Sequence, residues 1–95
     1  MINIKTKLIE IVHKHIPGCR IFLYGSRARG THAQGADYDI ALDAGEKIQR
    51  STIWEIQDDI ENSNIYVFVD ILDINNTSPN FLTEITKDFI SWNNE

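Results

Sequence analysis

The chain has 95 residues, 42% of them hydrophobic and 24% charged, which is the composition of a soluble globular protein with a modest core. Its formal charge of −5 at pH 7 and its scattered basic residues exclude tight nonspecific binding to duplex nucleic acid, and its one cysteine excludes an internal disulfide. The polar N-terminal segment is neither a signal peptide nor a membrane span, so we expect one cytoplasmic domain over residues 1–95 that binds neither nucleic acid directly nor a membrane.

The N-terminal part of the chain predicts a helix followed by two strands. Apolar residues recur every three or four positions over residues 4–16, which is typical of a helix with one buried face, and a Pro-Gly pair ends it. The run 20–24 (RIFLY) is a short β-prone segment that ends at Gly25. After a polar loop, residues 37–42 (DYDIAL) form a second strand candidate.

A second amphipathic helix is predicted in the middle of the chain. Thr52 and Glu55 have the spacing of a capping box, and the helix runs to about Asn62 with an inward face made of Ile53, Ile56 and Ile60. The run 65–72 (IYVFVDIL) is the strongest strand signal, because it is dense in β-branched and aromatic residues and apolar on both sides. That pattern predicts a central strand.

The last predicted element is a helix opened by Ser78 as the cap and Pro79 at the first helical position. The side chains expected to face inward are Phe81, Leu82, Ile85 and Phe89. The order α-β-α-β-α-β-α, with a short second helix after the first strand, indicates an α/β (α+β) fold in which a small mixed sheet is covered by helices.

A candidate phosphate-binding turn follows the first predicted strand. Gly25 lets the backbone approach a ligand closely, and Ser26 opens a short helical turn that offers a hydroxyl and amides to an anion. Arg27 and Arg29 place two cations where a triphosphate would lie. Taken alone, the pattern is equally that of an ordinary Gly-Ser turn with solvated arginines.

Two aspartates at the start of the second predicted strand form a candidate metal site. Asp37 and Asp39 are two residues apart, so in a strand they share one face, with Cα atoms roughly 6.6 Å apart. Two carboxylates this close resist joint ionisation unless a cation lies between them. Without Cys or His at ligand spacing, they suit Mg²⁺ or Mn²⁺, although a polar strand edge with solvated aspartates is the alternative.

A third acid strengthens the metal-site interpretation. Asp70 interrupts an otherwise apolar strand, where an ionised group without a partner costs several kcal/mol. If the two strands are neighbours, Asp70 can join Asp37 and Asp39 around one metal cluster. Asp73 would point to the opposite face, and we expect it to order the turn at Asn75.

The two tryptophans, Trp54 and Trp92, are expected to pack in the core or between helices. If either is exposed, it becomes a candidate anchor for a protein partner, because tryptophan is enriched among the residues that dominate binding energy at interfaces.

The motif Gly25-Ser26, ten residues, Asp37-x-Asp39, with a later Val-Asp70-Ile strand, resembles the polymerase-β-like nucleotidyltransferases, and among them the minimal nucleotidyltransferase (MNT) domains. The resemblance covers nearly the whole chain. It implies that the Gly-Ser turn holds the β- and γ-phosphates of ATP and that two Mg²⁺ ions bind the aspartates. Many relatives have Ser where this chain has Ala36, a difference that removes no ligand.

MNT domains are often encoded with a HEPN-domain toxin, a small helical ribonuclease, and act as its antitoxin. The resemblance therefore implies transfer of AMP from MgATP to a tyrosine hydroxyl of a HEPN toxin. A chain of this length has little room to enclose an acceptor, which agrees with an acceptor brought by a partner. Two alternatives remain: nucleotidyl transfer to a small molecule such as an aminoglycoside, and neutralisation of the toxin by binding and occlusion alone.

Overall fold

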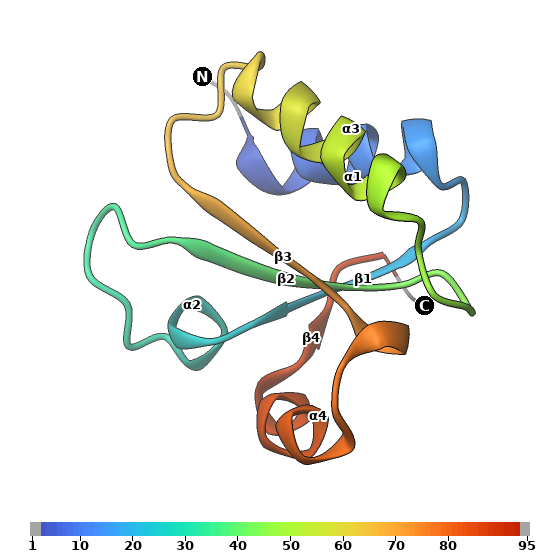
Figure 1. Ribbon diagram of the computed structural model, residues 1–95. Coiled ribbons are helices and arrows are strands. Elements are labelled where there is room, and N and C mark those ends of the chain that lie inside the picture. The colour runs from blue at the N-terminus through green and yellow to red at the C-terminus, as the bar shows by residue number, and fades with distance from the viewer. Residues whose placement is uncertain (1–2, 94–95) are drawn as a thin grey trace.

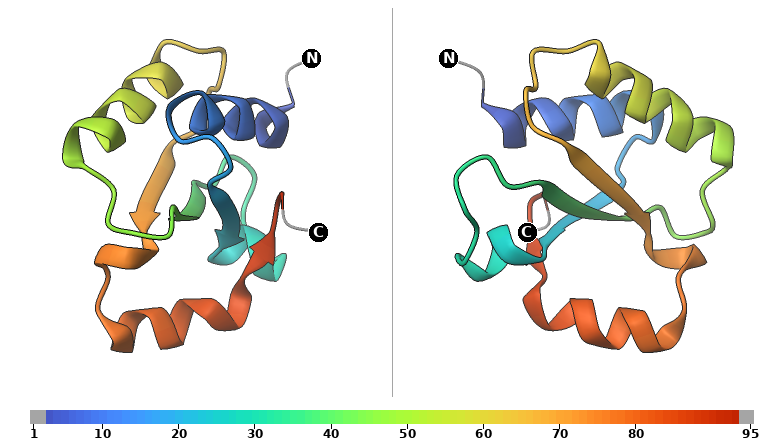
Figure 2. Two further views of the ribbon diagram at one scale, coloured as in Figure 1. Left: turned by 90° about the vertical axis from the view of Figure 1, so that its right-hand side faces the viewer. Right: turned by 60° about the vertical axis from the view of Figure 1, so that its left-hand side comes forward.

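Helices α1 (Ile4–His15) and α3 (Arg50–Glu61) cover one face of a four-stranded sheet, and α4 (Pro79–Ile85) lies against the other face (Figure 1). The same three layers are seen edge-on in Figure 2. The computed structural model describes residues 3–93. The remaining elements are β1 (Arg20–Tyr24), α2 (Ser26–Arg29), β2 (Tyr38–Asp43), β3 (Val69–Asp73), β4 (Ile90–Ser91) and the 3₁₀ turns η1 (Ile74–Asn76) and η2 (Thr86–Asp88).

The strand order across the sheet is β3-β2-β1-β4. β1 pairs antiparallel with both β2 and β4, whereas β2 and β3 are parallel and are connected through α3. A parallel pair needs such a crossover, because a tight hairpin can only join antiparallel strands. The crossover brings the start of β3 beside the start of β2.

The core consists of two apolar clusters separated by the sheet. Alternation along β1 sends Ile21 and Leu23 into the larger cluster, under α1 and α3, and Phe22 and Tyr24 into the smaller one, over α4. The Phe22 ring stacks on Phe89 with centroids 4.8 Å apart. The chain therefore buries apolar side chains on both faces of β1, the strand at which the two clusters meet.

The predicted fold class is confirmed, and the predicted order of helices and strands is found, with β4 added at the end. β3 differs from its prediction because it begins at Val69 and lies at the sheet edge, not in its centre. The preceding segment exposes Tyr66 (79%) and Phe68 (68%). A fully apolar run can mark a buried strand, but here only part of the run joins the sheet.

The last helix is shorter than predicted and the middle helix starts earlier. α4 ends at Ile85, and Phe81, which we expected to face inward, is 46% exposed. The predicted cap is confirmed, since the Ser78 hydroxyl accepts a hydrogen bond from the Phe81 amide at 3.3 Å. The predicted capping box is wrong: α3 begins at Arg50, before Thr52, and its N-cap residue makes no side-chain capping bond.

Asp73 orders the turn after β3, as the sequence predicted. Its carboxylate accepts hydrogen bonds from the amide of Asn75 at 3.0 Å and from the amide of Ile48 at 2.7 Å. The second bond fastens the segment that leads into α3 to the end of β3. No helix among residues 3–93 is long and apolar enough to cross a membrane.

Candidate active site

The Gly-Ser turn and the predicted aspartates lie at one end of the sheet, where β1 ends and β2 and β3 begin. Along β2, Ile40 joins the larger core cluster and Ala41 the smaller one, so Asp39 projects to the α4 face. Asp70 is the register partner of Asp39 in β3, and Tyr24 is its partner in β1. Neighbouring strands are about 4.8 Å apart, so the two carboxylates start from adjacent backbone positions on one face.

Gly25 allows the carboxylate of Asp39 to lie directly against the turn. A Cβ atom on Gly25 would overlap Asp39 Oδ2 and would lie 3.2 Å from its Cγ. The glycine also has φ = +77°, a conformation that L-residues with side chains rarely adopt. Both the space and the backbone conformation therefore require glycine here, and the close approach joins the predicted phosphate turn to the predicted metal site.

Negative charge is concentrated around Asp39. Burial, followed by the nearby charges of Asp70 and Asp37, raises the pKa of Asp39 above its ordinary value, while the Arg29 charge opposes the shift. The same environment raises the pKa of Tyr24 to about 12, first by burial and then through Asp70 and Asp39. Asp37 and Asp70 thus both act electrostatically on Asp39, although Asp70 comes from a distant part of the chain.

Asp70 is exposed, which corrects the argument that placed it in a buried strand. Its strand lies at the edge of the sheet. Its position opposite Asp39, and not burial, now connects it with the site. Asp37 is also exposed and immediately precedes β2 instead of lying within it.

The aspartates fit Mg²⁺ in their chemistry. Within residues 3–93, no three Asp, Glu, His or Cys side chains are gathered closely enough to hold a metal ion as they stand. Asp39 nevertheless lies near two further carboxylates that raise its pKa, with only Arg29 opposing them, and a divalent cation with oxygen ligands relieves that repulsion. Coordination by all three requires the exposed side chains of Asp37 and Asp70 to turn toward Asp39.

The two arginines of the turn have different surroundings. Arg27 donates from Nε to the Ala36 carbonyl at 2.9 Å, and its guanidinium lies 4.0 Å from the centre of the Tyr38 ring. The Tyr38 ring packs against the larger core cluster, on the face opposite Asp39. Arg27 therefore holds the end of the loop that leads to the aspartates and is separated from their side chains by the sheet.

Arg29 lies on the side of the carboxylates. Its Nη1 forms an ion pair with Asp88 Oδ2 at 2.7 Å, and its positive charge acts on Asp39. The Ser26 hydroxyl makes no hydrogen bond to any other part of the chain that the structure describes, so it is available to a ligand. The turn thus presents the Arg29 cation on the α4 face and also carries the unpaired hydroxyl of Ser26.

Sequence reasoning missed Asp88 and Tyr24. Asp88 meets Arg29 only through the return of the chain after α4, and no local pattern marks it. Tyr24 was included only as a strand residue. Its place immediately before Gly25 was a usable signal, because the last residue of a strand before a ligand-binding turn lies beside the site.

The crowded carboxylate predicts a pH-dependent gain in stability for Asp39→Asn. The folded-state pKa of Asp39 is raised, so ionisation is disfavoured in the folded protein, and this penalty is absent below its unfolded pKa of about 3.9 and complete above its folded pKa. In EDTA, the variant should have a higher free energy of unfolding than the wild type at pH 7, and the difference should diminish toward pH 3. Urea denaturation at both pH values measures this; a pH-independent difference contradicts it.

Comparisons with known proteins agree with this geometry. A family model described as "Polymerase beta, Nucleotidyltransferase" matches residues 6–91. A chain of a toxin-antitoxin complex crystallised with AMP-PNP has a TM-score of 0.78 at 24% identity, covering 93% of this chain and 71% of the other. A search of curated proteins finds no match.

Two further solved structures are similar over most of this chain. One is a mutant of the MntA-HpeT toxin-antitoxin complex, with a TM-score of 0.75 at 25% identity over 96% of this chain and 72% of the other. The second contains a tri-AMPylated Shewanella oneidensis HEPN toxin with an MNT antitoxin, with a TM-score of 0.71 at 21% identity over 93% and 67% of the two chains.

Proposed function

Because this chain belongs to the polymerase-β nucleotidyltransferase family, we propose that it transfers AMP from MgATP to a tyrosine hydroxyl of a HEPN toxin and thereby acts as the antitoxin. The observation that carries the proposal is the meeting of Asp39 with the Gly25 turn, opposite Asp70 on the neighbouring strand. The family match covers both segments. The partner is inferred from similar structures that contain MntA or MNT antitoxins with their toxins.

In the proposed reaction, the tyrosine oxygen attacks the α-phosphorus of ATP, the bond from that phosphorus to the bridging oxygen breaks, and pyrophosphate leaves. Gly25 and Ser26 hold the β- and γ-phosphates, with the Ser26 hydroxyl donating to a phosphate oxygen. Arg29, which is paired with Asp88 in this structure, leaves that ion pair and binds the triphosphate instead. Asp70 receives the proton of the attacking hydroxyl.

Asp37, Asp39 and Asp70 would hold Mg²⁺, with Mn²⁺ as a substitute. When bound, a pair of such ions lowers the pKa of an attacking hydroxyl and neutralises the charge of a leaving pyrophosphate. Asp39 is the residue that connects the metal ligands with the phosphate turn, because its carboxylate lies against Gly25. The proposed location is the cytoplasm, where ATP is supplied.

Two other functions use the same fold. Neutralisation by binding and occlusion alone would need none of the aspartates, and the crowding of charge around Asp39 would then serve no purpose. Transfer to a small molecule such as an aminoglycoside would need a pocket for the acceptor next to the aspartates. Neither alternative accounts for more of the observed geometry than transfer to a protein does.

The decisive experiment combines the purified chain, MgATP labelled at the α-phosphate and the HEPN toxin. We expect label on the toxin, a mass increase of one or more AMP groups by mass spectrometry, and loss of its ribonuclease activity. A toxin that is neutralised while its mass stays unchanged supports occlusion and contradicts the transferase. Label on an aminoglycoside but not on the toxin supports the small-molecule reaction.

A further inference from the structure

We propose that an exposed surface formed by Trp54, Gln57 and Glu61 of α3 together with Tyr66 and Phe68, here termed the Trp54 face, docks the acceptor protein through a basic patch on that protein. This inference rests on the proposed function and adds the surface by which the acceptor is held. Trp54 was expected in the core or between helices, and the structure corrects that expectation, since its side chain is 74% exposed.

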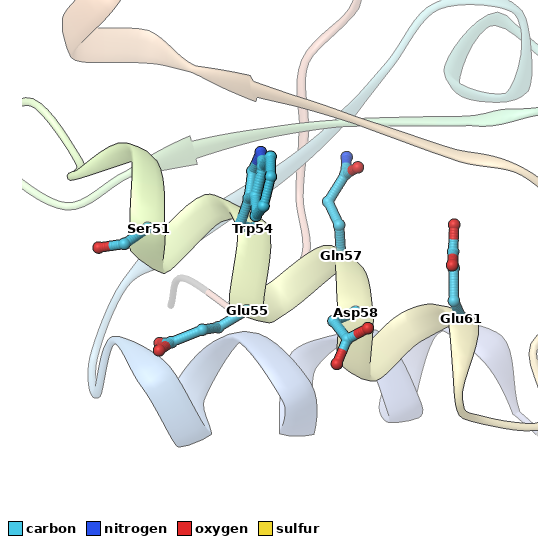
Figure 3. Close-up of a pocket in the computed structure, with 6 residues that line it drawn as sticks. All are labelled: Ser51, Trp54, Glu55, Gln57, Asp58 and Glu61. Carbon is cyan, nitrogen blue, oxygen red and sulfur yellow. The ribbon is translucent and has the colours of Figure 1, made fainter.

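The Trp54 face is continuous from the helix to the sheet edge. Trp54, Gln57 and Glu61 project from the same side of α3 (Figure 3). Gln57 and Glu61 also line a neighbouring hollow of about 310 Å³, whose other wall includes Tyr66 and Phe68. Trp54 thus lies exposed at one hollow, and Tyr66 and Phe68 lie exposed at the neighbouring hollow, which shares Gln57 and Glu61 with the first. Aromatic residues of this kind dominate the binding energy of protein interfaces.

The charge of this surface specifies the occupant. Glu55, Asp58 and Glu61 line the same hollow as the tryptophan, and the residues that line the two hollows include no Lys or Arg. A phosphate backbone is repelled by such a surface, and so is the same face of a second copy of this chain. A protein that presents an apolar side chain surrounded by Lys or Arg is complementary to it.

The position of the Trp54 face connects it with the acceptor. The Phe68 carbonyl accepts a hydrogen bond from the Tyr38 amide at 2.9 Å, so pairing with β2 begins two residues before Asp70. Among residues 3–93, no strand pairs with the outer edge of β3. A protein seated on Trp54 and extending over Phe68 therefore reaches Asp70, at the start of the candidate active site.

The test measures the affinity of the HEPN toxin for the full chain by calorimetry. Trp54→Ala is expected to weaken binding about 30-fold or more, as at a dominant interface residue. Glu61→Lys should weaken it about tenfold and make it less dependent on salt concentration. Phe81→Ala, which truncates another exposed aromatic on the opposite side of the sheet, is the matched control and should bind within about twofold of the wild type.

Transfer kinetics provide a second readout. Trp54→Ala should raise the KM for the toxin and leave kcat unchanged, because docking contributes equally before and during the reaction. The inference is overturned by wild-type affinity in Trp54→Ala, by an equal loss in Phe81→Ala, by a toxin that does not bind the wild type, or by a Trp54-dependent dimer of the chain alone. Tight binding that depends on Trp54, without any transfer, supports the docking surface and contradicts the transferase. Transfer to the toxin together with wild-type affinity in Trp54→Ala supports the transferase and contradicts the docking surface.

Discussion

Replacing Asp39 with Asn is expected to lower the rate of AMP transfer by about two to three orders of magnitude. Asn keeps the shape of the side chain against Gly25 but removes the charge that would hold a divalent cation between the turn and Asp70. Asp70→Asn should have an effect of at least about 100-fold, because in the proposed mechanism Asp70 is both a metal ligand and the proton acceptor. The measurement is single-turnover transfer of labelled AMP to the toxin.

The matched control for these variants is Glu10→Gln, which neutralises an exposed carboxyl on α1, on the other face of the sheet. Its transfer rate should equal that of the wild type. A readout independent of activity is available, since Mg²⁺ that binds only the folded state stabilises it. Mg²⁺ should therefore raise the unfolding midpoint of the wild type and of Glu10→Gln, but much less that of Asp39→Asn. Full activity in both Asp39→Asn and Asp70→Asn would falsify the assignment of the site.

Gly25→Ala is expected to lower the transfer rate to about 1% or less of the wild-type rate. The reason is that displacement of a catalytic group by about 1 Å lowers a reaction rate roughly 100-fold. The new Cβ overlaps the Asp39 carboxylate, which must move away from the turn. The variant should also lose about 2–4 kcal/mol of folding free energy, from positive-φ strain together with the overlap. Urea denaturation and single-turnover transfer measure the two effects.

Gly18→Ala separates backbone strain from the collision. Gly18 has φ = +78°, nearly the same as Gly25, but a Cβ there would meet nothing within 4 Å. This control should lose about 1 kcal/mol of folding free energy from strain alone and keep the transfer rate. Equal losses of stability and activity in the two variants would mean that the contact between Gly25 and Asp39 has no special role.

The local structure around the candidate site could be predicted from the sequence, because a turn or a strand start depends on neighbouring residues. Gly25, Ser26, Asp37 and Asp39 were proposed as site residues from their types and spacing, and the structure brings Gly25 and Asp39 together. What depended on strand order could not be read from local pattern. Alternation and β-propensity indicate that a strand exists, but not which neighbours it has. For this reason Asp70 was linked to the site by a burial argument that is wrong, although its register beside Asp39 places it there.

Side-chain partners distant in sequence were equally hidden. The Asp88 carboxylate that pairs with Arg29 comes from the turn after α4, and the stacking of Arg27 on Tyr38 depends on the path of the intervening loop. The exposure of Trp54 was missed because a hydrophobic residue type indicates only a tendency toward burial. Residue type alone does not distinguish an exposed tryptophan from a buried one.

The parallel pairing of β2 with β3 has a consequence for how the candidate active site is assembled during folding. Asp39 and Asp70 become neighbours only after the chain has passed through α3 and closed a long loop, a non-local step that slows folding. The hairpin of β1 and β2 needs no such closure. A nascent chain that has formed this hairpin already carries the turn and two aspartates, but the candidate site is complete only when β3 has paired with β2.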